Sequence, residues 1–335
     1  MVPPLKSLLI RSAMSRFTRS LGRSLAGRFV PVFMMHRVSD KEGRLNTAYL
    51  AMLRKQLEYI RREGYRPMPV EDVLQLLRNG EPLPLNAVSF TVDDGFLDQA
   101  EHLGPLFAEF DIPLTYFLIS DFLERRLWSW DDQLHYILTR SPRPRLTLTL
   151  PDGSEAVYDT DRYEEQFRPL RNRLKKVSHS RIYDWMDVLY EQADVERPDG
   201  IPESFAPMSW QDARCLQQQG HYLAPHTRSH RILSQLQPQE VEEEIIGSCD
   251  MLEQRLEHYS PVFAYPTGRL GDFGEREMDF LATTHLLGAV STVPGPVTRD
   301  SHPWAAPRYS MPGDFDTFLQ YLDYIEAFNT RLRQG

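Results

Sequence analysis

Two aspartates and two histidines are the residues of this sequence whose types and spacing could carry chemistry. Asp93 and Asp94 are adjacent in "TVDDG", and His226 and His230 stand four residues apart in "HTRSH". Two imidazoles and one carboxylate are a common ligand set for a catalytic divalent metal ion, which leaves a second carboxylate free to act as a base. Together the four residues predict metal-assisted hydrolysis.

Each pair also has a plainer interpretation. The Asp pair could be part of a turn, because Asp and Gly are favoured turn residues, and the His pair could be ordinary surface or core residues. Neighbouring strand residues point to opposite faces, so both carboxylates reach one site only where the strand ends and the backbone bends, as Gly95 permits. In an extended strand His226 and His230 would lie about 13 Å apart, whereas one helical turn separates them by a rise of about 6 Å. The metal site therefore requires the chain to turn at both places.

The elements that must position these residues alternate between apolar runs and segments of helical periodicity. Strands are expected at 28–38, 86–95, 112–120, 221–226, 261–266 and 286–293. Helical patterns separate most of them, which gives about six repeats of one strand-helix unit. This alternation predicts an α/β fold with a parallel sheet, and active-site residues are expected at the carboxyl ends of its strands.

Three further segments complete the predicted organisation. An insertion at about 121–205 interrupts the 30–315 core; in it "RLTLTLPDGSEAVYDT" predicts a β-hairpin followed by helix. Residues 316–335 form an amphipathic pattern that predicts one C-terminal helix. Residues 1–29 are basic and contain no acidic residue, so they could rest on an anionic membrane surface or pack on the domain.

Bulk composition excludes several classes of protein. The 335 residues are 41% hydrophobic and 25% charged, as in globular proteins, and no apolar run is long enough to cross a bilayer. A net charge of -9 argues against a nucleic-acid partner. Cys215 and Cys249 are not spaced as a metal knuckle or redox pair. Since residues 1–29 lack the features of a secretion signal, a cytoplasmic location is expected, with peripheral contact to the inner membrane as an option.

The motifs "TVDDG", "HTRSH" and "FAYPTG", in this order, resemble those of the polysaccharide deacetylases, carbohydrate esterase family four. "VFMMHRV" and "WSWDDQLHYIL" are similar to segments of bacterial members associated with exopolysaccharide and lipopolysaccharide clusters. The resemblance covers residues 30–312. It implies a distorted, incomplete (β/α) barrel of about seven strands and the hydrolytic removal of N-acetyl groups from amino-sugar glycans.

The resemblance also implies roles for single residues. Asp93 is the expected general base, and Asp94, His226 and His230 are the expected ligands of zinc or another divalent metal. The loop after Tyr265 is expected to supply a backbone N–H that binds the oxyanion of the tetrahedral intermediate and contacts the substrate.

The sequence departs from the family pattern at the partners of the catalytic groups. No Arg stands in the third motif to pair with the base, so Arg308, or with less support Arg269, is the expected substitute. No late Leu-x-His motif supplies a general acid, so His36, at the end of the first strand, and His302 are the candidates. Trp130 could stack on a sugar ring or pack in the interior.

The sequence therefore predicts a metal-dependent deacetylase acting on an N-acetylated glycan or a lipid-linked precursor. Two alternatives remain open. The same site could hydrolyse an O-acetyl ester or another C–N bond, or the protein could bind glycans on this fold without turnover.

Overall fold

The centre of the molecule is a parallel sheet. The computed structural model describes residue 22 and residues 26–334. The strand order is β12-β2-β4-β5-β8, with β3 beside β4. In that order the strands span Tyr309–Ser310, Val32–Met35, Ala87–Asp94, Thr115–Leu118, Tyr222–Pro225 and Arg66–Pro67. The central strand β4 is buried along its length except at half-buried Asp94, as expected of a strand covered on both faces.

Apart from the hairpin β6–β7 of the insertion, the described residues form two pairs of short strands outside this sheet. β9 (Val262–Ala264) and β10 (Gly288–Val290) form a parallel pair, and β1 (Phe29–Val30) and β11 (Val297–Thr298) form an antiparallel pair. Among the described residues no strand ladder joins β8 to β9 or β10 to β12. The predicted parallel α/β fold is confirmed, but hydrogen bonds do not close its strands into one continuous barrel; the count of seven barrel strands stays a prediction.

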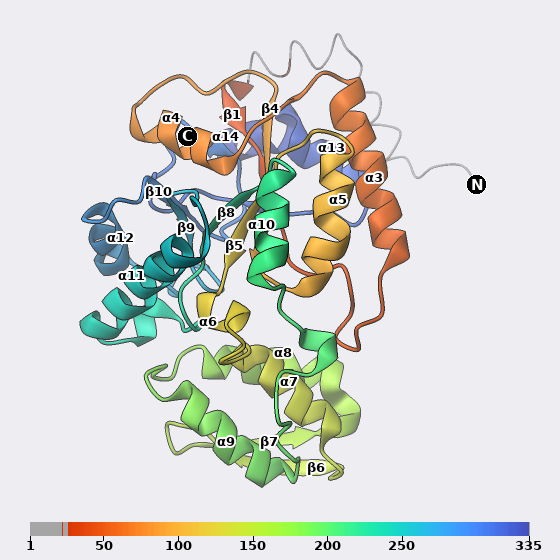
Figure 1. Ribbon diagram of the computed structural model, residues 1–335, viewed down its shortest axis with the longest axis vertical. Coiled ribbons are helices and arrows are strands. Elements are labelled where there is room, and N and C mark those ends of the chain that lie inside the picture. Colours follow the sequence, from red (N-terminus) through yellow and green to blue (C-terminus); the bar gives the residue numbers. More distant parts are fainter. Residues whose placement is uncertain (1–21, 23–25, 335) are drawn as a thin grey trace.

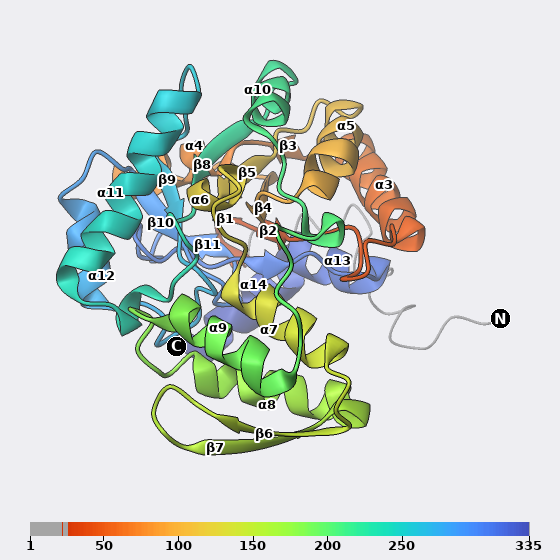
Figure 2. The ribbon, with the colours of Figure 1, turned by 60° about the horizontal axis from the view of Figure 1, so that its bottom comes forward.

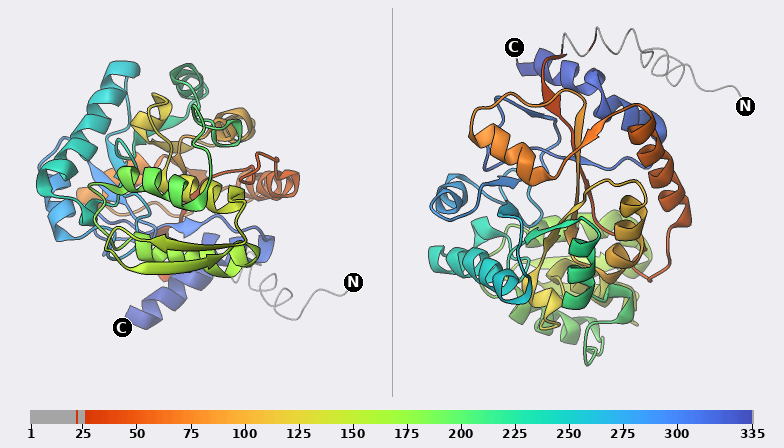
Figure 3. Two further views of the ribbon diagram at one scale, coloured as in Figure 1. Left: turned by 90° about the horizontal axis from the view of Figure 1, so that it is seen from below. Right: turned by 45° about the horizontal axis from the view of Figure 1, so that its top comes forward.

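Helices surround the sheet (Figures 1 and 3). They are α3 (Thr47–Arg62), α4 (Val70–Arg78), α5 (Gly104–Ala108), α6 (Ser120–Leu123), α10 (Trp210–Gln218), α11 (Pro238–Arg255) and α12 (Glu275–Ala282). The first of them shows why they form. Leu53, Leu57 and Ile60 recur at helical spacing and are fully buried, and the side chain of Asn46 caps the helix by accepting from the Tyr49 N–H.

The insertion is a small layer with its own apolar core. It comprises α7 (Trp130–Arg140), the hairpin β6–β7 (Arg145–Thr149 and Glu155–Asp159), α8 (Tyr163–Leu174) and α9 (Ile182–Ala193). The antiparallel register of β6 and β7 confirms the predicted hairpin. Figures 1 and 2 show this layer below the sheet, on the side of α6, which directly follows the carboxyl end of β5.

The C-terminal end of the chain differs from the prediction, and most of the N-terminal segment lies outside the described residues. The C-terminal segment forms two helices instead of the single one predicted, α13 (Phe315–Leu322) and α14 (Tyr324–Gln334). They are separated at buried Asp323, whose carboxylate accepts from the Tyr65 hydroxyl and from the backbone N–H of Tyr324. The basic segment predicted at 1–29 lies outside the described residues except for residues 22 and 26–29.

Candidate active site

The backbone turn at the end of β4 brings both aspartates to one cleft. Asp94 and Gly95 both have positive φ angles, 86° and 94°, so the chain bends between the strand and the following helix. A Cβ at Gly95 would lie 2.8 Å from Cδ1 of Leu123, so a side chain there would displace Leu123 and would also be strained by the positive φ. Gln99 stabilises the turn, because its amide group accepts from the Gly95 N–H and donates to the Asp93 carbonyl.

The two histidines come together in a loop, without the helical turn that the sequence spacing suggested. His226 directly follows β8, and Thr227 and His230 have positive φ angles of 65° and 56°, which fold the loop back on itself. Fully buried Glu244, on α11, holds this loop by accepting from the N–H and the hydroxyl of Ser229. The predicted requirement for a turn is met by left-handed backbone conformations.

Asp94, His226 and His230 form a group with the geometry of a metal site. Oδ1 of Asp94 lies 3.6 Å from Nε2 of His226 and 3.5 Å from Nε2 of His230. The three donor atoms lie within 4.8 Å of one another, and they are the one such group of three among the described residues. Oδ1 of Asp94 is buried and has no hydrogen-bond partner in the described part of the chain. The residues present therefore fit a divalent cation.

The electrostatics of this group agree with that fit. Burial lowers the pKa of His226 to about 4 and that of His230 to about 3, so both rings are neutral at pH 7 and can offer a lone pair. Burial, and then the charge of Asp93, raise the pKa of Asp94 well above its usual range. A carboxyl group in such surroundings gains a compensating charge when a cation binds beside it.

Asp93 has a different environment, dominated by Arg308. Burial alone would raise the pKa of Asp93, but the charge and hydrogen bonds of Arg308 outweigh it and lower that pKa to about 2. The guanidinium donates to both carboxylate oxygens, at 2.8 and 2.7 Å, and is itself fully buried. It also donates to the carbonyl of Ser291 and to the hydroxyl of Thr91, which fixes its plane. Of the two arginines considered from the sequence, Arg308 is the one beside Asp93.

The cleft around these groups has a volume of about 310 Å³. His36, just after β2, lines it with an exposed side chain, as do Asp93, Asp94 and both histidine ligands. His302 is not among the lining residues, and its Nδ1 accepts from the Trp304 N–H. The candidate acid ranked first from the sequence is therefore the one that faces the cleft.

Two residues considered for substrate contact turn their rings away from the cleft. Trp130 is fully buried in the insertion core, edge-on to His179, so the suggested stacking of its ring on a sugar is wrong. The ring of Tyr265 is also buried, stacked on Phe273, and its hydroxyl donates to the Trp304 carbonyl. In the loop after Tyr265, Thr267 lines the cleft.

The insertion contributes residues that the sequence analysis did not single out. Ser129, Asp131, Asp132 and Arg171 line the cleft beside the metal-site group. Ser129 Oγ lies 3.0 Å from Nδ1 of His230. The sequence signal was the second Asp-Asp pair of the chain, in "WSWDDQ", which resembles an ordinary helix start because acidic residues favour the first turn.

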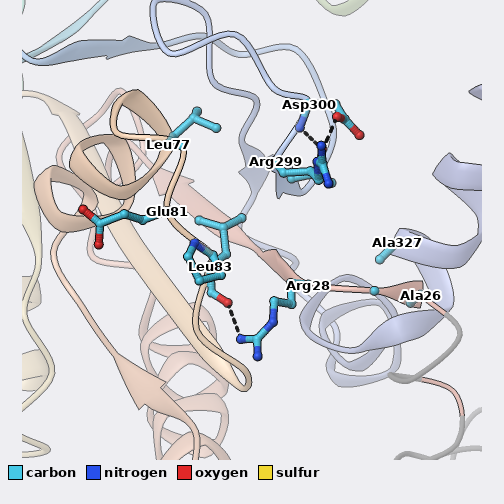
Figure 4. Close-up of a pocket in the computed structure, with 12 residues that line it drawn as sticks. Ala26, Arg28, Leu77, Glu81, Leu83, Arg299, Asp300 and Ala327 are labelled. Atoms are coloured by element: carbon cyan, nitrogen blue, oxygen red, sulfur yellow. Dashed lines mark hydrogen bonds and ion pairs between the residues drawn. The ribbon is translucent and has the colours of Figure 1, made fainter.

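A second hollow lies at the other end of the molecule and has a different character. It has a volume of about 570 Å³ and is bordered by α4, β1, β11 and α14 (Figure 4). Arg28 there donates to the Leu83 carbonyl, and Arg299 pairs with Asp300 at 3.5 Å. Both arginines thus have partners nearby, and none of the described residues that line the hollow is a histidine.

The fold and the site define a class of α/β proteins whose candidate active site lies at the carboxyl ends of parallel strands. Within this class the chain belongs to the polysaccharide deacetylase family, whose profile matches residues 80–274. The family acts on N-acetylated glycans and hydrolyses amide bonds. The resemblance noted from the motifs is confirmed.

Solved structures share the fold of this chain. The deacetylase PplD of Streptococcus pyogenes, in complex with acetate, aligns with a TM-score of 0.58 at 18% identity, over 88% of this chain and 98% of that one. IcaB of Ammonifex degensii aligns with a TM-score of 0.53 at 16% identity, over 90% and 98% of the two chains. At these identities the likeness shows a shared fold.

The curated relatives match a shorter stretch. Poly-beta-1,6-N-acetyl-D-glucosamine N-deacetylase of Escherichia coli (strain K12) is 28% identical over 91 residues, which is 27% of this chain and 14% of that protein. The match thus spans about a seventh of the relative. A separate structural finding is that none of the described helices is long and apolar enough to cross a membrane.

Proposed function

We propose that this protein is a metal-dependent hydrolase that removes N-acetyl groups from an amino-sugar polysaccharide or its precursor. One observation carries the proposal: the Asp94, His226 and His230 group stands beside a carboxylate, Asp93, that a buried arginine keeps ionised. A ligand set and a separate base are the two parts that metal-assisted amide hydrolysis requires.

Asp94, His226 and His230 would hold the metal, with zinc as the expected ion. When bound, such an ion lowers the pKa of a coordinated water from about 15.7 toward 7 and polarises a carbonyl oxygen. The protein supplies the rest. Asp93 accepts the proton of the attacking water, and Arg308 keeps that carboxylate oriented by donating to both of its oxygens.

The leaving group needs a proton, and His36 is the proposed donor. Water adds to the acetamide carbon, the C–N bond breaks, the sugar amine takes up a proton and acetate leaves. His36 suits this role because it lines the same cleft as Asp93. The backbone of the loop after Tyr265, in which Thr267 lines the cleft, is the proposed oxyanion contact.

Within the substrate class, a poly-N-acetylglucosamine is the first substrate to test, because the curated relative is named for deacetylation of the β-1,6-linked polymer. The alternative of a glycan-binding protein without turnover depends on the absence of an Arg in the third motif and of a late Leu-x-His motif. Arg308 beside Asp93 and His36 in the cleft are observations that support the enzyme.

The test combines metal analysis with acetate release. The full chain is expected to bind about one zinc and to release acetate from N-acetylglucosamine oligomers. Asp94→Asn and His226→Ala should lose both zinc and activity, whereas Asp93→Asn should keep zinc and lose activity. Metal-free protein that is fully active would refute the proposal. Faster acetate release from O-acetylated sugars would instead identify an esterase.

A further inference from the structure

The two histidines of the metal-site group are oriented by different parts of the molecule. Nδ1 of His226 lies 2.7 Å from the backbone carbonyl of Ala264, at the end of β9. A carbonyl oxygen can only accept, so this nitrogen carries the proton and Nε2 presents a lone pair toward Asp94. Strand β9 therefore sets the tautomer of His226, through a backbone atom.

Nδ1 of His230 depends on side chains of the insertion instead. It lies 3.0 Å from the hydroxyl of Ser129, which in turn donates its proton to the carboxylate of Asp131. Because a serine hydroxyl has one proton and that proton is already engaged, Ser129 accepts from His230. The result for His230 is the same as for His226: Nδ1 is protonated and Nε2 faces Asp94.

A half-buried ion pair with Arg171 holds Asp131 in place. Arg171, on α8, donates to the second oxygen of Asp131 from Nε at 3.0 Å and from a terminal nitrogen at 2.6 Å. A guanidinium can only donate, so both of these hydrogen bonds make Asp131 the acceptor. A carboxylate can only accept. The series of hydrogen bonds that runs from His230 to Arg171 therefore has a donor and an acceptor at every step.

We propose that the insertion completes the metal site: Arg171, Asp131 and Ser129 fix the tautomer and direction of His230 and so set the affinity for the metal. This inference rests on the proposed function, since it concerns the same site. The three are positioning residues, because none of their atoms belongs to the donor group. The removal of a hydrogen-bond partner behind a ligating histidine typically weakens metal binding about 10- to 100-fold.

The experiment measures zinc affinity of the full chain by competition with a chromophoric chelator. Ser129→Ala removes the hydroxyl and changes no charge, and it leaves the pair of Asp131 and Arg171 intact, so the variant should fold. We expect it to bind zinc about 10-fold or more weakly. Ser39→Ala is the matched control, because Ser39 lines the same cleft without contacting a ligand, and its zinc affinity should equal that of the unmodified chain.

Asp131→Asn provides a second comparison. Its control is Asp132→Asn, which removes the adjacent charge on the same helix, where Asp132 pairs with Lys41 at 3.2 Å. Both variants remove one negative charge near the site. Any additional loss of zinc affinity in Asp131→Asn therefore measures the hydrogen-bond connection from Asp131 to His230. The visible absorption of Co²⁺ bound in place of zinc should change in Ser129→Ala and Asp131→Asn and stay unchanged in the controls, since it reports ligand geometry.

The possible failures are distinguishable. A full chain that binds no zinc would overturn the proposed function and this inference together. A full chain that binds zinc, with Ser129→Ala binding equally well and Asp131→Asn losing no more than Asp132→Asn, would overturn the inference alone. If Asp131→Asn does not fold because Arg171 is left unpaired, Ser129→Ala decides the question.

Discussion

Replacement of Arg308 by Met is the perturbation with the largest expected effect on the proposed base. Asp93 has 2% of its side chain exposed, so without the guanidinium its charge would be buried with no cation hydrogen-bonded to it. The lowering of the Asp93 pKa from 3.8 to about 2 corresponds to about 2 kcal/mol in favour of the ionised form. Loss of one partner of a buried pair costs about 3–5 kcal/mol of folding free energy.

The sign of the pH effect follows from the two opposing causes. Burial raises the pKa of Asp93 and Arg308 lowers it, so in Arg308→Met burial prevails and the pKa rises above 3.8. The acid limb of kcat/KM for acetate release should therefore move to higher pH, and activity at neutral pH should fall. Arg308→Lys should lie between, because it keeps a charge but cannot donate to both oxygens in one plane.

The measurements are the pH profile of kcat/KM and urea unfolding of the metal-free protein. The double variant Asp93→Asn/Arg308→Met should lose less stability than the sum of the two single variants, because it leaves no unpaired charge. An unshifted acid limb together with a stability loss below about 1 kcal/mol would show that Arg308 does not control Asp93.

Three other perturbations test the site more widely. Gly95→Ala should destabilise the protein by about 1–3 kcal/mol in urea unfolding, because the position has positive φ and a Cβ would meet a leucine side chain; wild-type stability would contradict the described turn. The stability of the metal-free protein should fall as pH drops from 6.5 toward 4, because His226 and His230 take up protons there in the unfolded chain but not in the folded one. Equal urea midpoints at pH 7 and pH 5 would argue against neutral, buried rings. Glu244→Gln should lower the free energy of unfolding by about 3–5 kcal/mol and weaken zinc binding, because Glu244 holds the loop of His226 and His230 and pairs with Arg231 at 2.9 Å. Unchanged zinc affinity would show that the loop keeps its shape without this carboxylate.

The sequence was sufficient to predict the strand ends and the residues that follow them. The alternation of apolar runs and helical periodicity depends on local burial, so it located β4 and β8 and placed Asp94 and His226 at the same edge of the sheet. The manner of the turn at His230 was not predictable in the same way. Spacing suggested a helical turn, whereas contacts with α11 stabilise a left-handed loop.

Residues that act through distant contacts were the ones that sequence reasoning missed or left undecided. Arg308 reaches Asp93 across 215 positions, so the choice between it and Arg269 required the structure. The role of Asp131 depends on how the insertion packs against the sheet. The break at Asp323 has the same origin, because periodicity continues through it and a contact from Tyr65 stabilises the interruption.

Neighbouring carboxylates on one strand acquire opposite properties because the end of β4 turns them toward different surroundings. Asp93 meets a fully buried guanidinium and has a pKa of about 2, whereas Asp94 meets two neutral imidazoles, and its pKa is raised well above the usual range. A general base must be ionised before the substrate binds. A metal-ligating carboxylate is stabilised in its ionised form when a cation binds beside it. The proposed roles, Asp93 as base and Asp94 as metal ligand, thus follow from the groups that the fold places beside each carboxylate. Arg308 is the residue that makes the two environments different.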